Sequence, residues 1–236
     1  MSEQILSMLT IFGIMKNSFK NGKFTCKKYL LNAYLYIFLS LLLVSLSVKL
    51  FDEYKIPSLR NFNSHFKFFG FLLLSIILLI TVMSWPTDNL VGKHALWLLW
   101  IALMGYTLYP LFQINKNLFT MVKYQALLAM VIITLFSLKN PNLISISWGT
   151  TLFALLIGLI VVQLFSLFIP GLYTTRLHYI ISYASFLLFT FFMMYDTKRL
   201  IIKAKQCVKA DYINASMSIV LDGINIFTDL FSIQEM

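Results

Sequence analysis

Seven long apolar runs are the feature of this sequence that most restricts its fold. They lie near residues 29–48, 68–85, 95–113, 118–138, 148–169, 177–197 and 212–232. Each run has about 18 to 23 residues, which at 1.5 Å per residue is enough to cross a hydrocarbon core about 30 Å thick. With 59% hydrophobic and 12% charged residues, the chain is more apolar than a soluble domain. It is predicted to be an integral membrane protein.

The runs predict helices rather than the strands of a membrane barrel. They are continuous, whereas barrel strands alternate apolar and polar residues over about ten positions. In lipid, only helices and closed barrels satisfy the backbone polar groups. The fourth run contains Lys123 and the seventh contains two aspartates, so these are the weakest of the seven predictions. The expected fold is an all-α membrane bundle of seven transmembrane helices.

The spans also predict the domain organisation. Residues 1–28 form a cytoplasmic N-terminal segment, residues 29–232 a single membrane domain, and residues 233–236 a short tail. Loops as short as Asn115 to Asn117 leave no room for a soluble module. The first 15 residues lack a basic region before their apolar part and a clear small-residue cleavage site, so a removed signal peptide is not expected. They are expected at most to form a short interfacial helix.

Lysine and arginine predict the orientation, because cytoplasmic loops carry an excess of them. Seven spans place twelve of the 19 basic residues on the face of the N-terminus and seven on the other face, so the N-terminus is predicted to be cytoplasmic. Cys26 and Cys207 fall on this face, where thiols stay reduced, so no disulfide is expected. The predicted location is the endoplasmic reticulum or another internal membrane, with a bacterial inner membrane as the alternative.

Several functional classes find no support. His65, His94 and His178 lie in or beside three different loops without metal-ligand spacing. The sequence has no Gly-rich phosphate loop, nucleophile elbow or zinc-protease motif, so the protein is not expected to be an enzyme or to hold a tight cofactor. Apart from the net charge of +10, nothing favours nucleic-acid binding. The lipid bilayer is the expected partner, and the sequence does not predict an oligomeric state.

Three of the nine acidic residues lie within the spans: Asp196, Asp222 and Asp229. An acid at a helix centre costs about 2.5 to 3.5 kcal/mol on insertion scales, so it usually faces a bundle interior or a water-filled cavity. Asp222 is about ten residues into its helix, near the midplane. Ser218, Asp222, Asn225 and Asp229 follow spacings of four, three and four, so they form a polar stripe on one helix face.

Spans six and seven form a hairpin, so Asp196 and Asp222 are expected to approach each other. Two carboxylates in a low dielectric would share a proton, and the titration would belong to the pair. The simpler alternative is that Asp196 pairs with Arg199 one turn away, while Asp222 hydrogen-bonds a neighbouring helix.

The segment YDTKRLIIKAKQCVKADYINASMSIVLDGINIF, residues 195–227, resembles the C-terminal signature of the Bax inhibitor-1 family. Tyr195, Asp196 and Thr197 match its first motif, Tyr/Phe-Asp-Thr-Gln, although Lys198 replaces the glutamine. A second motif, Leu-Asp-x-Ile-Asn-x-Phe, is similar to residues 221–227. The segment ALMGYTLYP, residues 102–110, resembles a third-span motif of the family, with Met104 in place of threonine. Gly149 and Gly158 fall in its glycine-rich fifth span, and KKYLLNAY, residues 27–34, is similar to its first-span start.

This resemblance implies that the C-terminal helix lies at the centre of the seven and that the bundle forms a proton-sensitive calcium leak. Asp196 and Asp222 would then be the pH-sensing pair on the ion path and weak Ca²⁺ ligands, since Ca²⁺ prefers oxygen. Calcium would be the transported ion and the proton the regulator. Ser218, Asn225 and Asp229 are further candidates for the ion path.

One feature departs from the family pattern. Some members carry a second-span arginine that latches the aspartate pair, but here that span has only Lys67, at its opposite end from Asp196. Arg199 or Lys198 is the candidate substitute for this latch.

Two other classes remain open. An intramembrane aspartyl protease also carries aspartates on spans six and seven, but residues 219–221 do not match its Gly-x-Gly-Asp motif. The stronger alternative is a membrane protein that restrains cell death through partner proteins of cell-death control, without transporting ions.

Overall fold

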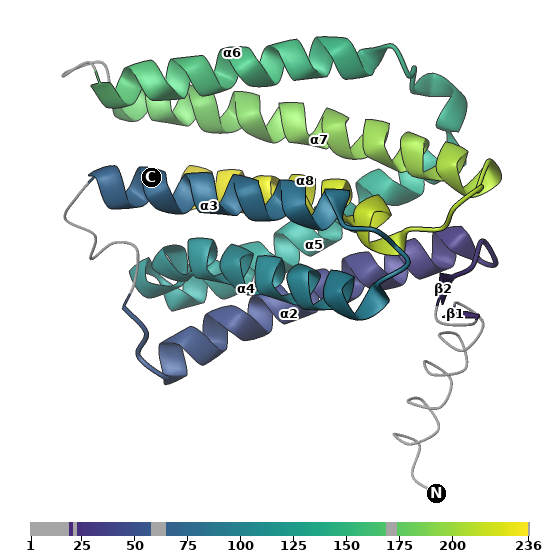
Figure 1. Cartoon of the computed structure of the whole chain (residues 1–236). Coiled ribbons are helices and arrows are strands. Elements are labelled where there is room, and N and C mark those ends of the chain that lie inside the picture. The colour runs from purple at the N-terminus through teal and green to yellow at the C-terminus, as the bar shows by residue number, and fades with distance from the viewer. Residues whose placement is uncertain (1–18, 21–22, 58–64, 169–173, 236) are drawn as a thin grey trace, which may run out of the picture. The chain divides into compact units, whose positions relative to one another are not determined.

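The computed structural model describes residues 19–20, 23–57, 65–168 and 174–235, and within these ranges each predicted span is a helix (Figure 1). A pair of two-residue antiparallel strands, β1 (Phe19–Lys20) and β2 (Lys23–Phe24), precedes the first helix. The helices are α2 (Tyr29–Glu53), α3 (His65–Ser84), α4 (Leu90–Ile114), α5 (Lys116–Lys139), α6 (Trp148–Phe168), α7 (Thr175–Lys205) and α8 (Tyr212–Glu235), with a short 3₁₀ helix, η2 (Pro141–Leu143), before α6.

Six of the described helices are long and apolar enough to cross a membrane. They include α5 and α8, the two spans that the sequence predicted most weakly. The seventh, α3, has an apolar described part at Leu73–Ser84. α8 continues to Glu235, through most of the residues assigned to a tail. Most of the predicted N-terminal segment, residues 1–28, lies outside the described residues. The chain is therefore an all-helical, multi-pass membrane protein.

The chain divides into two compact units. The first unit comprises Met1–Pro110 and Lys203–Met217, and the second comprises Leu111–Ile202 and Ser218–Met236. The continuous helix α8 thus gives its first turns to the first unit and its remaining turns, with Asp222 and Asp229, to the second unit.

Hydroxyl side chains within the helices bond to the helix backbone. Ser40 and Ser137 each donate to the carbonyl oxygen four residues earlier, at 2.7 Å, and Ser75 does so at 3.0 Å. A hydroxyl without a partner is costly in an apolar environment, so these bonds let polar residues lie in membrane helices.

In the first unit, α2 and α4 pack along their length. The rings of Tyr36 and Trp97 lie 5.4 Å apart near the starts of the two helices, and the rings of Phe51 and Tyr109 lie 6.1 Å apart near their ends. Between these pairs, a Cβ at Gly105 would lie 2.6 Å from the Cβ of Ser47, so the glycine allows close approach. The two helices therefore run parallel, as expected if α3 crosses back between them.

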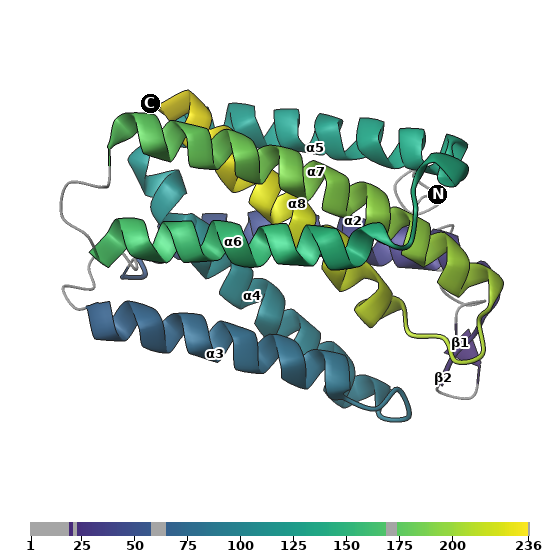
Figure 2. The same cartoon turned by 90° about the horizontal axis from the view of Figure 1, so that it is seen from above.

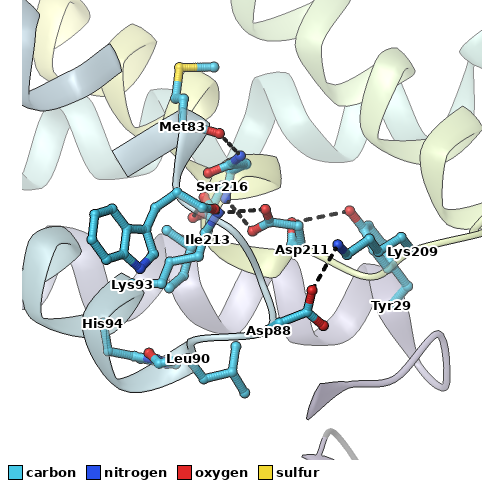
Figure 3. A network of polar contacts seen from close by, with 12 residues as sticks. Tyr29, Met83, Asp88, Leu90, Lys93, His94, Lys209, Asp211, Ile213 and Ser216 are labelled. Atoms are coloured by element: carbon cyan, nitrogen blue, oxygen red, sulfur yellow. Dashed lines mark hydrogen bonds and ion pairs between the residues drawn. The ribbon is translucent and has the colours of Figure 1, made fainter. Parts of the chain in front are cut away.

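A buried ion pair joins the start of α4 to the residue before α8. Lys93 is fully buried, and its ammonium donates to Asp211 Oδ2 at 2.7 Å and to the Trp85 carbonyl oxygen at 2.9 Å (Figure 3). Lys93 is one of the twelve basic residues that the predicted topology assigns to the face of the N-terminus. The structure instead makes the lysine an internal anchor.

Asp211 also caps α8. Its Oδ1 accepts from the backbone N–H of Asn214 at 3.0 Å, and its carbonyl oxygen accepts from the Tyr29 hydroxyl at 3.3 Å (Figure 3). The Asn214 amide donates to the Met83 carbonyl oxygen at the end of α3, at 2.7 Å. The first turn of α8 is therefore fixed to α2, α3 and α4 by polar contacts.

The expectation of two reduced thiols is wrong for this structure. Cys26 and Cys207 form a disulfide that joins the segment before α2 to the connection between α7 and α8, with 5.8 Å between the two Cα atoms. Reading the sequence along the chain could not detect this pairing, because 181 positions separate the two residues.

We expect Lys93→Met to destabilise the protein strongly, because it leaves the Asp211 carboxylate without its buried partner. Breaking a buried pair from one side costs about 3 to 5 kcal/mol. SDS-induced unfolding in mixed micelles would measure the loss. The matched control is Lys209→Met: Lys209 pairs with Asp88 at 3.7 Å, with side chains 64% and 58% exposed, and such a pair contributes about 0 to 1 kcal/mol. Equal losses in the two variants would contradict the anchoring role of Lys93.

Candidate functional site

The two motif aspartates lie together in the second unit. Asp196 on α7 is 9% exposed and Asp222 on α8 is 5% exposed. The two carboxylates are close enough to interact electrostatically, as the sequence analysis expected of the hairpin formed by α7 and α8. The site is thus a buried acidic pair between two consecutive helices.

Two buried oxygen atoms at this site have no hydrogen-bond partner among the described residues. They are Oδ2 of Asp222 and Oγ1 of Thr197, the residue after Asp196. A buried polar atom without a partner costs about 1 to 3 kcal/mol, and such atoms in native proteins usually indicate a functional group or a water or ion. Asp222 therefore has a carboxylate oxygen available to hold a proton, a water molecule or a cation.

Asp196 has a cationic neighbour on its own helix. The Arg199 guanidinium lies 3.6 Å from Asp196 Oδ1, and it also lies over the Tyr195 ring, 5.7 Å from the ring centroid. The Arg199 side chain is 49% exposed, so it links the buried carboxylate to the helix surface. This geometry agrees with both sequence hypotheses for Arg199, a latch and a simple ion pair one turn away.

Lys198, the other candidate latch, contacts a different group. Its ammonium donates to the Pro141 carbonyl oxygen at 2.6 Å, in the 3₁₀ helix between α5 and α6. Among the contacts of the described residues, Arg199 is the candidate that pairs with an aspartate of the acidic pair.

The other residues of the polar stripe lie before and after Asp222 on α8. Ser218, Asn225 and Asp229 are each partly exposed, so the stripe is less enclosed than Asp222. The Ser185 side chain on α7 interacts with the Asp229 carboxylate by hydrogen bonding, while Asp229 Oδ2 has no partner in the described part of the chain. Sequence reasoning did not identify Ser185, because a serine among apolar residues carries no motif.

Figures 1 and 2 show α6 and α7 lying side by side, and Gly149 of α6 meets Tyr195 of α7, the residue before Asp196. A Cβ at Gly149 would lie 2.6 Å from Tyr195 Cζ and would also collide with the Tyr195 hydroxyl. Gly149 therefore makes room for the tyrosine of the Tyr-Asp-Thr motif. The sequence places Gly149 in the glycine-rich span of the family resemblance, but the contact of Gly149 with Tyr195 was not predicted.

The site does not contain a preformed metal cluster. Within the described residues, no group of three or more His, Cys, Asp or Glu side chains could hold a metal ion. Two carboxylates with water can contact a cation weakly, and weak contact is compatible with passage of the ion.

The fold and this site together define a multi-pass helical membrane protein with a buried acidic pair. The family model described as inhibitor of apoptosis-promoting Bax1 matches residues 26–236, nearly the whole chain. The chain therefore belongs to the Bax inhibitor-1 family, and the resemblance found in its sequence is confirmed. A search of curated proteins gives no match.

We expect Gly149→Ala to destabilise the protein, because the new methyl group displaces the Tyr195 ring beside Asp196. Overpacking of this kind costs about 1 to 3 kcal/mol. Gly158→Ala on the same helix is the matched control: nothing lies within 4 Å of a Cβ there, so this change should be neutral or slightly stabilising. SDS-induced unfolding compares the two variants. Equal effects would show that the contact with Tyr195 does not restrict residue 149.

Proposed function

We propose that this protein is a pH-sensitive calcium leak channel of the Bax inhibitor-1 type, which modulates calcium stores and inhibits cell death. The observation that carries the proposal is Asp222: it is 5% exposed, one of its oxygens has no partner among the described residues, and Asp196 lies nearby. A membrane protein has little reason to retain such a group for stability alone, because burying an acid is costly.

The mechanism follows from the charge of the acidic pair. When ionised, the pair attracts a cation and offers it oxygen ligands. Protonation removes both the charge and the ligands, so cation contact at this point depends on pH. Because two carboxylates bind weakly, the ion can also leave, as conduction requires. Calcium is the transported ion in this proposal, and no catalytic residue is assigned.

We further propose that α8 is the innermost of seven spans and that its polar stripe extends the path. Its apolar window is 56% buried, against 6% to 39% in the other five candidate spans. Ser218, Asn225 and Asp229 would line the path on either side of Asp222. An internal membrane such as the endoplasmic reticulum, with the N-terminus in the cytoplasm, is the proposed location.

A second candidate function is supported by the description of the family. The family description, inhibitor of apoptosis-promoting Bax1, refers to cell death and does not mention an ion. A protein of this kind would act by contacting membrane proteins of cell-death control and would not need the acidic pair. The two candidates differ in whether Asp196 and Asp222 are required.

We expect purified protein in liposomes to release calcium at a rate that changes between pH 5 and pH 8. In Asp222→Asn and Asp196→Asn, the amide stands in for a protonated carboxyl group. Each variant should therefore lose the pH dependence, and its rate at pH 8 should approach the wild-type rate at pH 5. A fluorescent calcium indicator measures the release.

Asp88→Asn is the matched control, because it removes an exposed carboxylate that lies outside the helices. It should leave the pH profile unchanged. If folded wild-type protein releases no more calcium than empty liposomes at any pH, the leak is refuted. Cell protection that survives loss of both aspartates would then establish the partner-based function.

We also expect Arg199→Gln to change the pH profile of the leak, because it removes the cation 3.6 Å from Asp196. The change should be modest, since a half-exposed ion pair contributes about 0.2 to 1 kcal/mol. Lys198→Gln is the matched control, because that ammonium bonds to Pro141. Identical profiles for wild type and Arg199→Gln would exclude the latch role of Arg199.

A further inference from the structure

The disulfide between Cys26 and Cys207 closes a small cluster of contacts at the start of α8. We name this cluster the α8 clasp and define it as residues 24–29 together with residues 207–212. Both segments belong to the first unit. The Cα atoms of the two cysteines are 5.8 Å apart, within the usual range for a disulfide.

The clasp has contacts that do not depend on the sulfur atoms. The Tyr212 hydroxyl donates to the Thr25 carbonyl oxygen, and the rings of Phe24 and Tyr212 lie 4.7 Å apart. The Tyr29 hydroxyl donates to the carbonyl oxygen of Asp211, which caps α8. These contacts would hold the two thiols near each other when the disulfide is reduced, so the bond could reform without refolding.

The disulfide is accessible and lies among basic residues. Cys26 is exposed and Cys207 is half-buried. Lys27 and Lys28 follow Cys26 directly, and Lys209 is two residues from Cys207; all three lysines are exposed. Redox-active cysteines are typically accessible and surrounded by positive charge, which favours the reactive thiolate. A buried structural disulfide would show neither property.

We propose that Cys26 and Cys207 form a reversible redox site that locks and unlocks the α8 clasp. The co-reactant is a low-molecular-weight disulfide of the glutathione class. One protein thiolate attacks a sulfur of this disulfide, forms a mixed disulfide and releases one small thiol. The second protein thiolate then attacks the mixed disulfide, which forms the Cys26–Cys207 bond and releases the second small thiol. Two protein thiols are oxidised and one small disulfide is reduced, and the two thiol protons end on the released thiols.

The predicted topology explains why the bond would be reversible. The distribution of Lys and Arg places both cysteines on the cytoplasmic face, where glutathione reduces accessible disulfides. A bond at this position would form when the redox poise becomes more oxidising. It would then restrain the first turn of the helix that carries Asp222.

The test is a redox titration of the full-length protein in detergent or lipid. Samples are equilibrated in reduced and oxidised glutathione at ratios that run from a cytosol-like to an endoplasmic-reticulum-like poise, quenched with acid and labelled with a maleimide polymer. The shift on a gel gives the oxidised fraction. We expect this fraction to change from mostly reduced to mostly oxidised over the series, and to return when the ratio is reversed. A pair that stays oxidised, or stays reduced, over the whole series overturns the proposal.

A second measurement tests the locking of the clasp. We expect the oxidised protein to melt about 4 to 15 °C above the reduced protein, because a disulfide across a long loop restrains the unfolded chain. Cys26→Ser and Cys207→Ser should both fold, since the other clasp contacts remain, and neither should show a redox-dependent shift. Equal melting temperatures for the oxidised and reduced wild type would overturn the locking role. Neither measurement involves ion flux, so the result is independent of the proposed leak.

Discussion

The low dielectric of the membrane is the constraint on which the rest of this structure depends. Serine hydroxyls within the helices donate to the backbone four residues earlier, and the fully buried ammonium of Lys93 bonds to a carboxylate and a carbonyl oxygen. Several buried polar atoms nevertheless have no hydrogen-bond partner among the described residues, and two of them, Asp222 Oδ2 and Thr197 Oγ1, lie at the acidic pair. At Asp222 the cost of an unpaired buried polar atom falls on a carboxylate, the most expensive of these groups to bury.

The two parts of α8 have different roles. Its first turn is held by polar contacts: Asp211 caps it, Lys93 neutralises that cap, and Asn214 bonds to the end of α3. Its later turns carry the acidic residue that is buried without a full set of partners. The polar contacts of the first turn and the buried carboxylate of Asp222 thus lie on one continuous helix.

The sequence predicted the helices well because the length of an apolar run in a membrane protein nearly equals the length of its span. It also selected Asp196 and Asp222, since a midplane acid is rare and both lie in family motifs; both side chains are buried, and their role on an ion path stays a prediction. It did not predict the Lys93–Asp211 pair, because a lysine near a helix start normally indicates topology. The sequence spacing of Cys26 and Cys207 likewise says nothing of their distance in space. These misses all depend on contacts between segments distant in the chain.

The burial of Lys93 also affects the prediction of which face of the protein is cytoplasmic. Lys93 lies inside the protein and is paired, so it should not count among the loop charges that set topology. Without it, eleven basic residues instead of twelve remain on the face of the N-terminus, against seven on the other. The bias keeps its direction, and under the predicted topology the accessible Cys26–Cys207 bond would lie on the side where thiols are normally reduced. A permanent structural disulfide conflicts with that placement, whereas a reversible one satisfies both the charge distribution and the observed bond.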